Sequence, residues 1–115
     1  MTNTASIKER YLKDSVRVRL GGIAANLARV HSFSKNPLHK KAVENLLDES
    51  KYFIEWTANE AESDMKEFLI NLQITIALWQ LNYNDIWSND LRKQELERDS
   101  KEYSNQILVL SGLIK

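Results

Sequence analysis

The segment FLINLQITIALWQLNYN, residues 68–84, holds no charged residue in a chain where Asp, Glu, Lys and Arg make up 28% of 115 residues. A helix that spans a membrane, a helix buried on all sides and a helix that docks onto a second molecule would each leave such a segment. The three arrangements imply different folds and different functions. The positions of the apolar residues within the segment separate them.

On a helix with about 100° between successive residues, the apolar side chains of this region form two opposed stripes. The first has the width of a core-facing helix side, and it consists of Met65, Phe68, Leu69, Leu72, Ile76, Trp79, Tyr83 and Ile86. The second stripe lies opposite and consists of Ile70, Ile74, Ala77, Leu78 and Leu81. Asn, Gln and Thr residues separate the stripes. Because a single membrane span needs about 20 apolar residues, these polar positions exclude membrane insertion.

The second stripe predicts that protein covers this side of the helix as well. Leaving one large aliphatic side chain in water forgoes about 1.5–3 kcal/mol of burial, so several together favour association. Two arrangements remain open, in which either the chain's own helices or a second molecule covers the stripe. The leading hypothesis is a non-enzymatic module that forms a homodimer or binds a helical partner, with an interaction surface of Ile70, Ile74, Leu78 and Leu81.

The rest of the chain predicts further helices, because apolar residues recur at spacings of three and four. The chain has only three glycines and one proline, so we expect short connections. Short connections make neighbouring helices antiparallel. The sequence therefore predicts one all-α domain over residues 1–115, an up-and-down antiparallel four-helix bundle with short loops and helices at about 6–33, 37–56, 57–86 and 89–114.

Capping residues set these boundaries. Asn36 can cap a helix whose first position is Pro37, where a missing amide proton costs nothing. Thr57 and Glu60 match a capping box that would start the third helix, and Ser63–Asp64 offers an alternative start. Ser88 or Asn89 caps the last helix, which the apolar C-terminal residues extend to about 114.

The pair Gly21–Gly22 interrupts the pattern of the first helix. Each glycine inside a helix costs about 1 kcal/mol relative to alanine, so the pair marks either a bend or a close contact. Alanines follow at positions 24, 25 and 28, and these small side chains favour close packing.

Charge is segregated along the chain although the formal net charge is zero. Residues 1–41 hold nine basic and two acidic side chains, whereas residues 42–90 hold two basic and ten acidic ones. We expect these opposite charges to face one another across the first two helices. An alternative is nucleic-acid binding through a basic face of the first helix, formed by Arg10, Lys13 and Arg17. No aromatic residue interleaves with that face, so nucleic acid is the weaker alternative.

Catalytic templates find no support in the sequence. The chain has no cysteine, which excludes disulfides, thiolate catalysis and cysteine-type zinc sites and is compatible with the cytoplasm. Its N-terminus lacks the apolar core of a signal peptide. The two histidines do not match di-iron or zinc spacing, and no phosphate-binding loop is present. We therefore predict no metal site and no cofactor.

One end of the predicted bundle nevertheless gathers several functional groups. His31 lies on the inward face of the first helix, near the expected positions of Tyr83, Trp87 and Arg92. A second alternative is therefore a ligand-binding or catalytic bundle with a small polar pocket formed by His31, Tyr83, Trp87 and Arg92. The plainer interpretation is a half-buried histidine bonded to one neighbour.

At NLARVHSFSKNP (26–37) and DESKYFIEWTANEAE (48–62) the sequence resembles small helical proteins of cyanobacteria that have no assigned activity. The resemblance implies a helical protein of a cyanobacterial cytoplasm and transfers no functional residue. The chain departs from it at Asn59, where proline is expected, which bears on the sharpness of the turn after the second helix.

Overall fold

The computed structural model describes residues 4–113, and every regular element within that range is a helix. Its elements are α1 (Thr4–Leu12), α2 (Val16–Phe33), η1 (Pro37–His39), α3 (Lys40–Thr57), η2 (Ala58–Glu60), α4 (Ser63–Leu81), α5 (Tyr83–Trp87) and α6 (Asp90–Leu110). The all-α class is therefore as predicted. None of the helices in this range is both long and apolar enough to cross a membrane.

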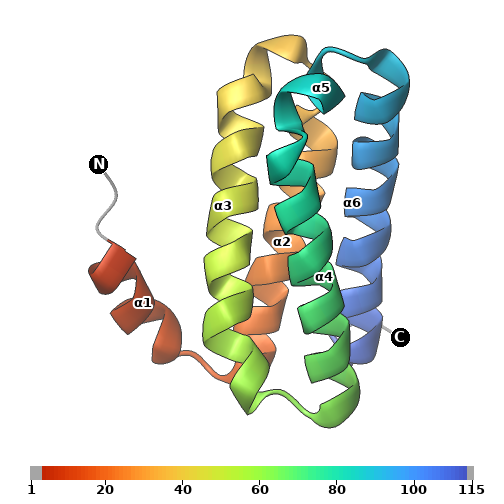
Figure 1. Cartoon of the computed structure of the whole chain (residues 1–115). Helices are drawn as coiled ribbons and strands as arrows, with labels where there is room; N and C mark the ends of the chain where they lie inside the picture. The colour runs from red at the N-terminus through yellow and green to blue at the C-terminus, as the bar shows by residue number, and fades with distance from the viewer. Residues whose placement is uncertain (1–3, 114–115) are drawn as a thin grey trace.

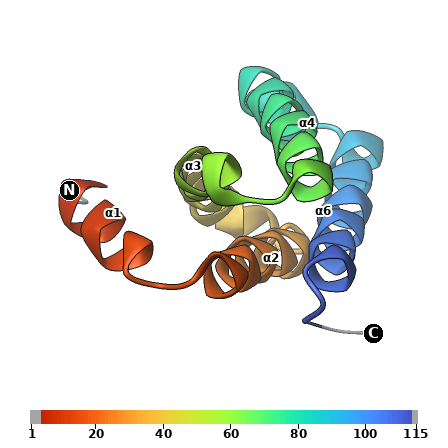
Figure 2. The same ribbon diagram turned by 90° about the horizontal axis from the view of Figure 1, so that it is seen from below.

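The four long helices α2, α3, α4 and α6 lie side by side, and consecutive ones run in opposite directions (Figure 1). Helix α2 packs against both α3 and α6, whereas the contact between α4 and α6 is thinner. The short helix α1 stands apart from this group and lies next to α3 (Figure 2).

Six of the eight residues of the core-facing stripe predicted over 65–86 are buried, and Phe68 and Trp79 are half-buried against the core. Leu69, Leu72 and Ile76 are fully enclosed, and Met65, Tyr83 and Ile86 are nearly so. They meet apolar side chains from the other long helices, of which the fully buried ones are Ile23, Leu27, Val30, Val43, Leu47, Ile54, Leu96 and Ile107. Spacing by three and four therefore identified the core correctly.

The first predicted helix, at 6–33, is wrong because the chain breaks between α1 and α2. Ser15 has an extended backbone, with φ −63° and ψ 158°, and its Oγ accepts a hydrogen bond from the Val18 N–H at 3.2 Å. This cap starts α2 afresh. The pair Gly21–Gly22 lies inside α2 without a break.

Close packing at the glycine pair is confirmed, although its contacts are not with a long helix. A Cβ on Gly21 would lie 3.4 Å from the Leu113 side chain, and one on Gly22 would lie 3.8 Å from the Tyr11 ring. Leu113 reaches α2 because Gly112 reverses the chain with φ 75°. The N–H groups of Gly112 and Leu113 bond to the carbonyls of Val109 and Leu108, which is a Schellman motif.

This motif corrects the predicted end of the last helix. Helix α6 ends at Leu110 rather than at 114, a residue that lies outside the described range. The start is confirmed, because the Asn89 side chain accepts a hydrogen bond from the Arg92 N–H at 3.1 Å. Asn36 caps η1 through the Leu38 N–H at 2.9 Å, but the α-helix predicted to start at Pro37 begins only at Lys40, after this short 3-10 helix.

The helix predicted at 57–86 is divided into η2, α4 and α5. Thr57 forms no capping bond, because its hydroxyl is buried and points to Tyr11 instead. Helix α4 begins at Ser63, the alternative start, after an extended Ala61. It ends before Asn82, whose side chain donates to the Leu78 carbonyl at 2.9 Å.

Candidate functional site

The second stripe of α4 is exposed. Ile70, Ile74, Leu78 and Leu81 are 46%, 57%, 54% and 80% exposed, and Ala77 between them is also exposed. Residues 4–113 therefore leave about half or more of each of these four side chains uncovered. Of the two arrangements left open by the sequence, cover by the chain's own helices is not seen.

Three of the polar side chains beside the stripe are bonded within the molecule, whereas the buried Gln80 Oε1 has no hydrogen-bond partner in residues 4–113. Thr75 donates to the Asn71 carbonyl at 3.1 Å, Asn82 bonds to the Leu78 carbonyl, and Gln73 reaches the Lys51 carbonyl at 3.5 Å. These bonds occupy polar groups that would otherwise need water. The result is a largely apolar face over residues 70–81 of α4, bordered at its N-terminal end by Lys66 and Glu67.

The proposed pocket residues do not converge. His31 Nδ1 lies 2.8 Å from the Glu97 carbonyl, and since a carbonyl only accepts, Nδ1 carries the proton. Tyr83 and Trp87 have ring centroids 5.7 Å apart and donate to the carbonyls of Lys40 and Pro37. Tyr83 thus joins α5 to the start of α3, and Trp87 joins it to η1, whereas His31 bonds to α6 and the Arg92 side chain is exposed.

A hollow of about 780 Å³ borders His31 but has none of its three predicted companions in its lining. His31 and Phe68 stand in the lining together with α6, whose Gln94, Arg98 and Asn105 contribute to it. These α6 residues lie opposite the buried side of that helix. The hollow is therefore a shallow open surface over α6 rather than an enclosed cavity.

The predicted basic face is also divided. Arg10 lies in the last turn of α1, Lys13 in the turn that follows, and Arg17 in the first turn of α2, so the three do not share one helical face. Arg17 donates to the Gly112 carbonyl at 2.7 Å and holds the end of α6. The break at Ser15 removes the continuous helix on which this basic stripe depended.

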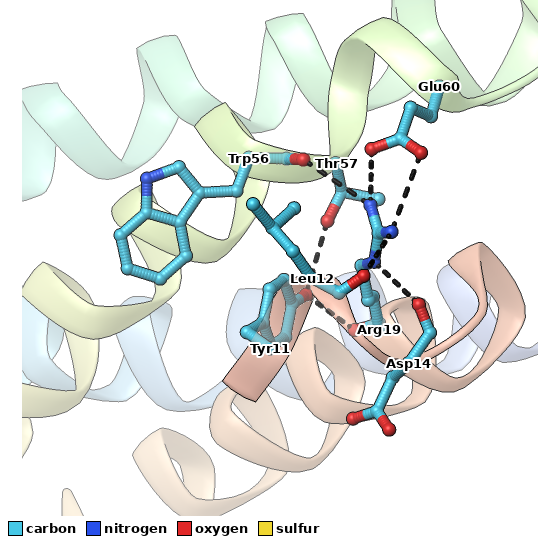
Figure 3. Close-up of polar contacts among 7 residues, drawn as sticks. All are labelled: Tyr11, Leu12, Asp14, Arg19, Trp56, Thr57 and Glu60. Carbon is cyan, nitrogen blue, oxygen red and sulfur yellow. Dashed lines mark hydrogen bonds and ion pairs between the residues drawn. The ribbon is translucent and has the colours of Figure 1, made fainter. Parts of the chain in front are cut away.

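A buried arginine that the sequence did not single out organises the junction of α1, α2 and η2 (Figure 3). Arg19 is 5% exposed, and each of its five N–H donors has an acceptor. Its Nε donates to the Asp14 carbonyl, and its Nη atoms donate to the carbonyls of Leu12 and Trp56. Both Nη atoms also bond to the Glu60 carboxylate, at 2.6 and 3.4 Å.

Tyr11 completes this cluster. Its hydroxyl donates to the Arg19 carbonyl at 2.9 Å and accepts from Thr57 at 3.2 Å, and its ring stacks on Phe53 with centroids 4.1 Å apart. Burial raises the pKa of Tyr11 to about 12. The hydrogen bond from Arg19 holds the pKa of Glu60 below its usual value. The neutral phenol and the ionised carboxylate are thus the forms that the fold favours.

A signal for Arg19 exists in the sequence. Arg19 stands seven residues after Leu12 and four before Ile23. This spacing places Arg19 on the same helix face as these apolar residues. Charge segregation predicted that many opposite charges face one another between the first two long helices. Within residues 4–113, Arg19–Glu60 is instead the one ion pair that joins the basic and acidic segments across separate elements. The expected seam of many pairs between the first two long helices is therefore wrong.

The effect of pH tests the Arg19–Glu60 pair. Because folding lowers the pKa of Glu60 from 4.5, the pair contributes stability above that pH and loses it as the pH falls through the folded-state pKa. Wild-type protein should therefore lose more stability than Glu60→Gln on acidification from neutral pH to below about pH 4, as measured by denaturant unfolding. The exposed control Glu95→Gln should show no such difference. A constant gap between wild type and Glu60→Gln would contradict this role.

No protein-family model, curated protein or solved structure matches this chain. The resemblance to cyanobacterial proteins therefore rests on its two quoted segments. Function must be argued from the surfaces of the molecule itself.

Proposed function

We propose that this protein is a non-enzymatic module, an up-and-down antiparallel four-helix bundle, which forms a homodimer through the exposed stripe of α4. The exposure of Ile70, Ile74, Leu78 and Leu81 carries the proposal. Full burial of one large aliphatic side chain is worth about 1.5–3 kcal/mol, and a dimer would recover the part that corresponds to the exposed fraction of each of these side chains. The absence of cysteine is compatible with a cytoplasmic location, which forms part of the proposal.

The absence of charge favours a second copy as the occupant. In a two-fold contact residue i meets residue j and residue j meets residue i, so a face that carried charges of one sign would oppose like charges. Residues 68–84 hold none. In an antiparallel pairing centred on Ile74, this residue meets its own copy and Ile70 meets Leu78. A basic or acidic partner would find no complementary charge on the stripe.

The size of the stripe predicts a weak dimer. Helix α4 has 19 residues, which corresponds to a length of about 28 Å. One helix face of that length buries less than the roughly 800 Å² per partner of a standard interface. We therefore expect a dissociation constant in the micromolar range.

Sedimentation velocity over a range of concentrations tests the dimer. Wild-type protein should shift from monomer to dimer with increasing concentration, and the double variant Ile74→Asp/Leu81→Asp should remain monomeric with an unchanged helical circular dichroism signal. Val18→Asp is a matched control, because Val18 on α2 is 56% exposed, close to the value for Ile74. A wild-type monomer at all concentrations, or dimers of the double variant, would count against the proposal.

A further inference from the structure

A small groove between α1 and α3 differs in chemistry from the stripe of α4. Its volume is about 200 Å³, and its lining consists of Thr4, Ile7, Asn45, Asp48, Glu49, Tyr52, Phe53 and Trp56. Most of the α3 members recur at spacings of three and four, which places them on one helix face. Pockets for drug-sized ligands measure about 300–1,000 Å³, so this groove fits a group the size of one side chain.

Aromatic rings form one wall of the groove. The centroid of Trp56 lies 5.6 Å from that of Tyr52 and 6.0 Å from that of Phe53. Aromatic faces carry negative potential and attract cations within about 6 Å of the ring centroid. The Lys8 ammonium of α1 already lies 6.0 Å from the Trp56 ring. A cation of the chain itself, the Lys8 ammonium, therefore already lies at the aromatic wall.

Two carboxylates complete the lining, and no lysine or arginine does. Asp48 is exposed, and Glu49 is half-buried with one oxygen accepting from the Asn26 amide at 3.0 Å. Within residues 4–113 neither carboxylate has an ion-pair partner. The groove thus carries two negative charges that a bound cation would neutralise, whereas an anion would be repelled.

The combination favours an organic cation over a metal ion. The described part of the chain holds no group of three His, Cys, Asp or Glu side chains able to ligate a metal. Ile7 and the rings offer contacts to methyl and methylene groups instead. We infer that this groove binds an alkylammonium group, in the form of a quaternary amine or of a primary amine such as a lysine side chain.

Nuclear magnetic resonance of the three tryptophan indole N–H groups tests this site. Titration of the full chain with tetramethylammonium chloride should shift the Trp56 signal, assigned with Trp56→Phe, in a saturable manner and leave those of Trp79 and Trp87 in place. The uncharged analogue tert-butanol and an equal concentration of sodium chloride should not do so. Parallel titration with n-butylammonium distinguishes the two sources, since the tighter of the two ions identifies the preferred amine.

Variants separate binding from folding. Asp48→Asn should weaken tetramethylammonium binding about three- to fivefold, as expected for one partly exposed charge, whereas Glu95→Gln on α6 should not change it. Lys8→Gln should strengthen binding, because it removes the ammonium that competes for Trp56. Equal shifts with tert-butanol, or no saturable shift of Trp56 with either ammonium ion, would overturn the inference. Neither result bears on the dimer, which uses α4.

Discussion

Replacing Arg19 with methionine should lower the free energy of unfolding by about 2–4 kcal/mol. The guanidinium group bonds to the carbonyls of Leu12, Asp14 and Trp56, and methionine would leave all three without that donor. A buried polar group left unpaired costs about 1–3 kcal/mol, and partial access of water to the turn reduces the sum. Glu60 adds little to this cost, because its side chain is 51% exposed and can be hydrated.

Denaturant unfolding followed by circular dichroism measures this loss. Arg19→Lys should restore only a minor part of it, because an ammonium group has three donors on one atom and cannot span the acceptors that surround the planar guanidinium. Arg98→Met is the matched control, since the Arg98 side chain is 69% exposed and within residues 4–113 pairs only with the adjacent Asp99. We expect a change within about 0.5 kcal/mol there. If Arg19→Met proved as stable as Arg98→Met, the cluster would not stabilise the fold.

The same variant should also loosen α1. Tyr11 is the one buried residue in this helix. The Arg19 guanidinium donates to the carbonyls of Leu12 and Asp14, which precede and follow Lys13 in the turn after α1. Cleavage by trypsin after Lys13, in that turn, should therefore be faster in Arg19→Met than in Arg98→Met. Equal rates would mean that the stack of Tyr11 on Phe53 is sufficient to hold α1.

Apolar spacing predicted the core because burial is a local property of a helix face. Leu69, Leu72 and Ile76 are fully buried as the first stripe required, and Ile74 is exposed on the opposite side. The two asparagine caps were predictable for a related reason, since a cap bonds to its own next turn. Both features depend only on residues a few positions apart, so a single sequence is sufficient to predict them.

Helix ends were predicted less well where two local signals competed. Apolar spacing runs through Ser15 without interruption, but its hydroxyl caps α2, and this bond prevails over the spacing. At the other end of the chain, the apolar run favours continued helix, whereas Gly112 adopts the left-handed conformation that ends α6. In both places one turn-forming residue outweighed a pattern of many.

The candidate pocket failed for a different reason. His31, Tyr83 and Trp87 each bond to a backbone carbonyl 43 to 66 residues away in the sequence. Backbone carbonyls have no sequence signature, so residue types alone do not reveal such partners. The Arg19 cluster is similar, because three of its acceptors are carbonyls. Only the position of Arg19 on an apolar face signals it in advance.

Substitution by aspartate should greatly destabilise the protein at Ile76 but hardly at Ile74, although both isoleucines lie on α4, two positions apart. Ile76 is fully buried, so Ile76→Asp removes its burial and places a carboxylate in the core, at a cost of several kcal/mol for each effect. Because a domain of this size is stable by about 5–15 kcal/mol, we expect this variant to lose most or all of its folded population. Ile74→Asp places the same charge in water and should change the stability of the monomer by no more than about 0.5 kcal/mol.

Denaturant unfolding followed by circular dichroism at low protein concentration makes this comparison. Dilution matters because a dimer stabilises its folded protomers by mass action, which would add a concentration-dependent loss to Ile74→Asp. A loss that appears only at high concentration links the exposed stripe to association. Similar large losses in both variants at low concentration would mean that the chain itself covers both sides of α4. The charge-free segment 68–84 would then be a central helix, and the proposed dimer would lose its physical basis.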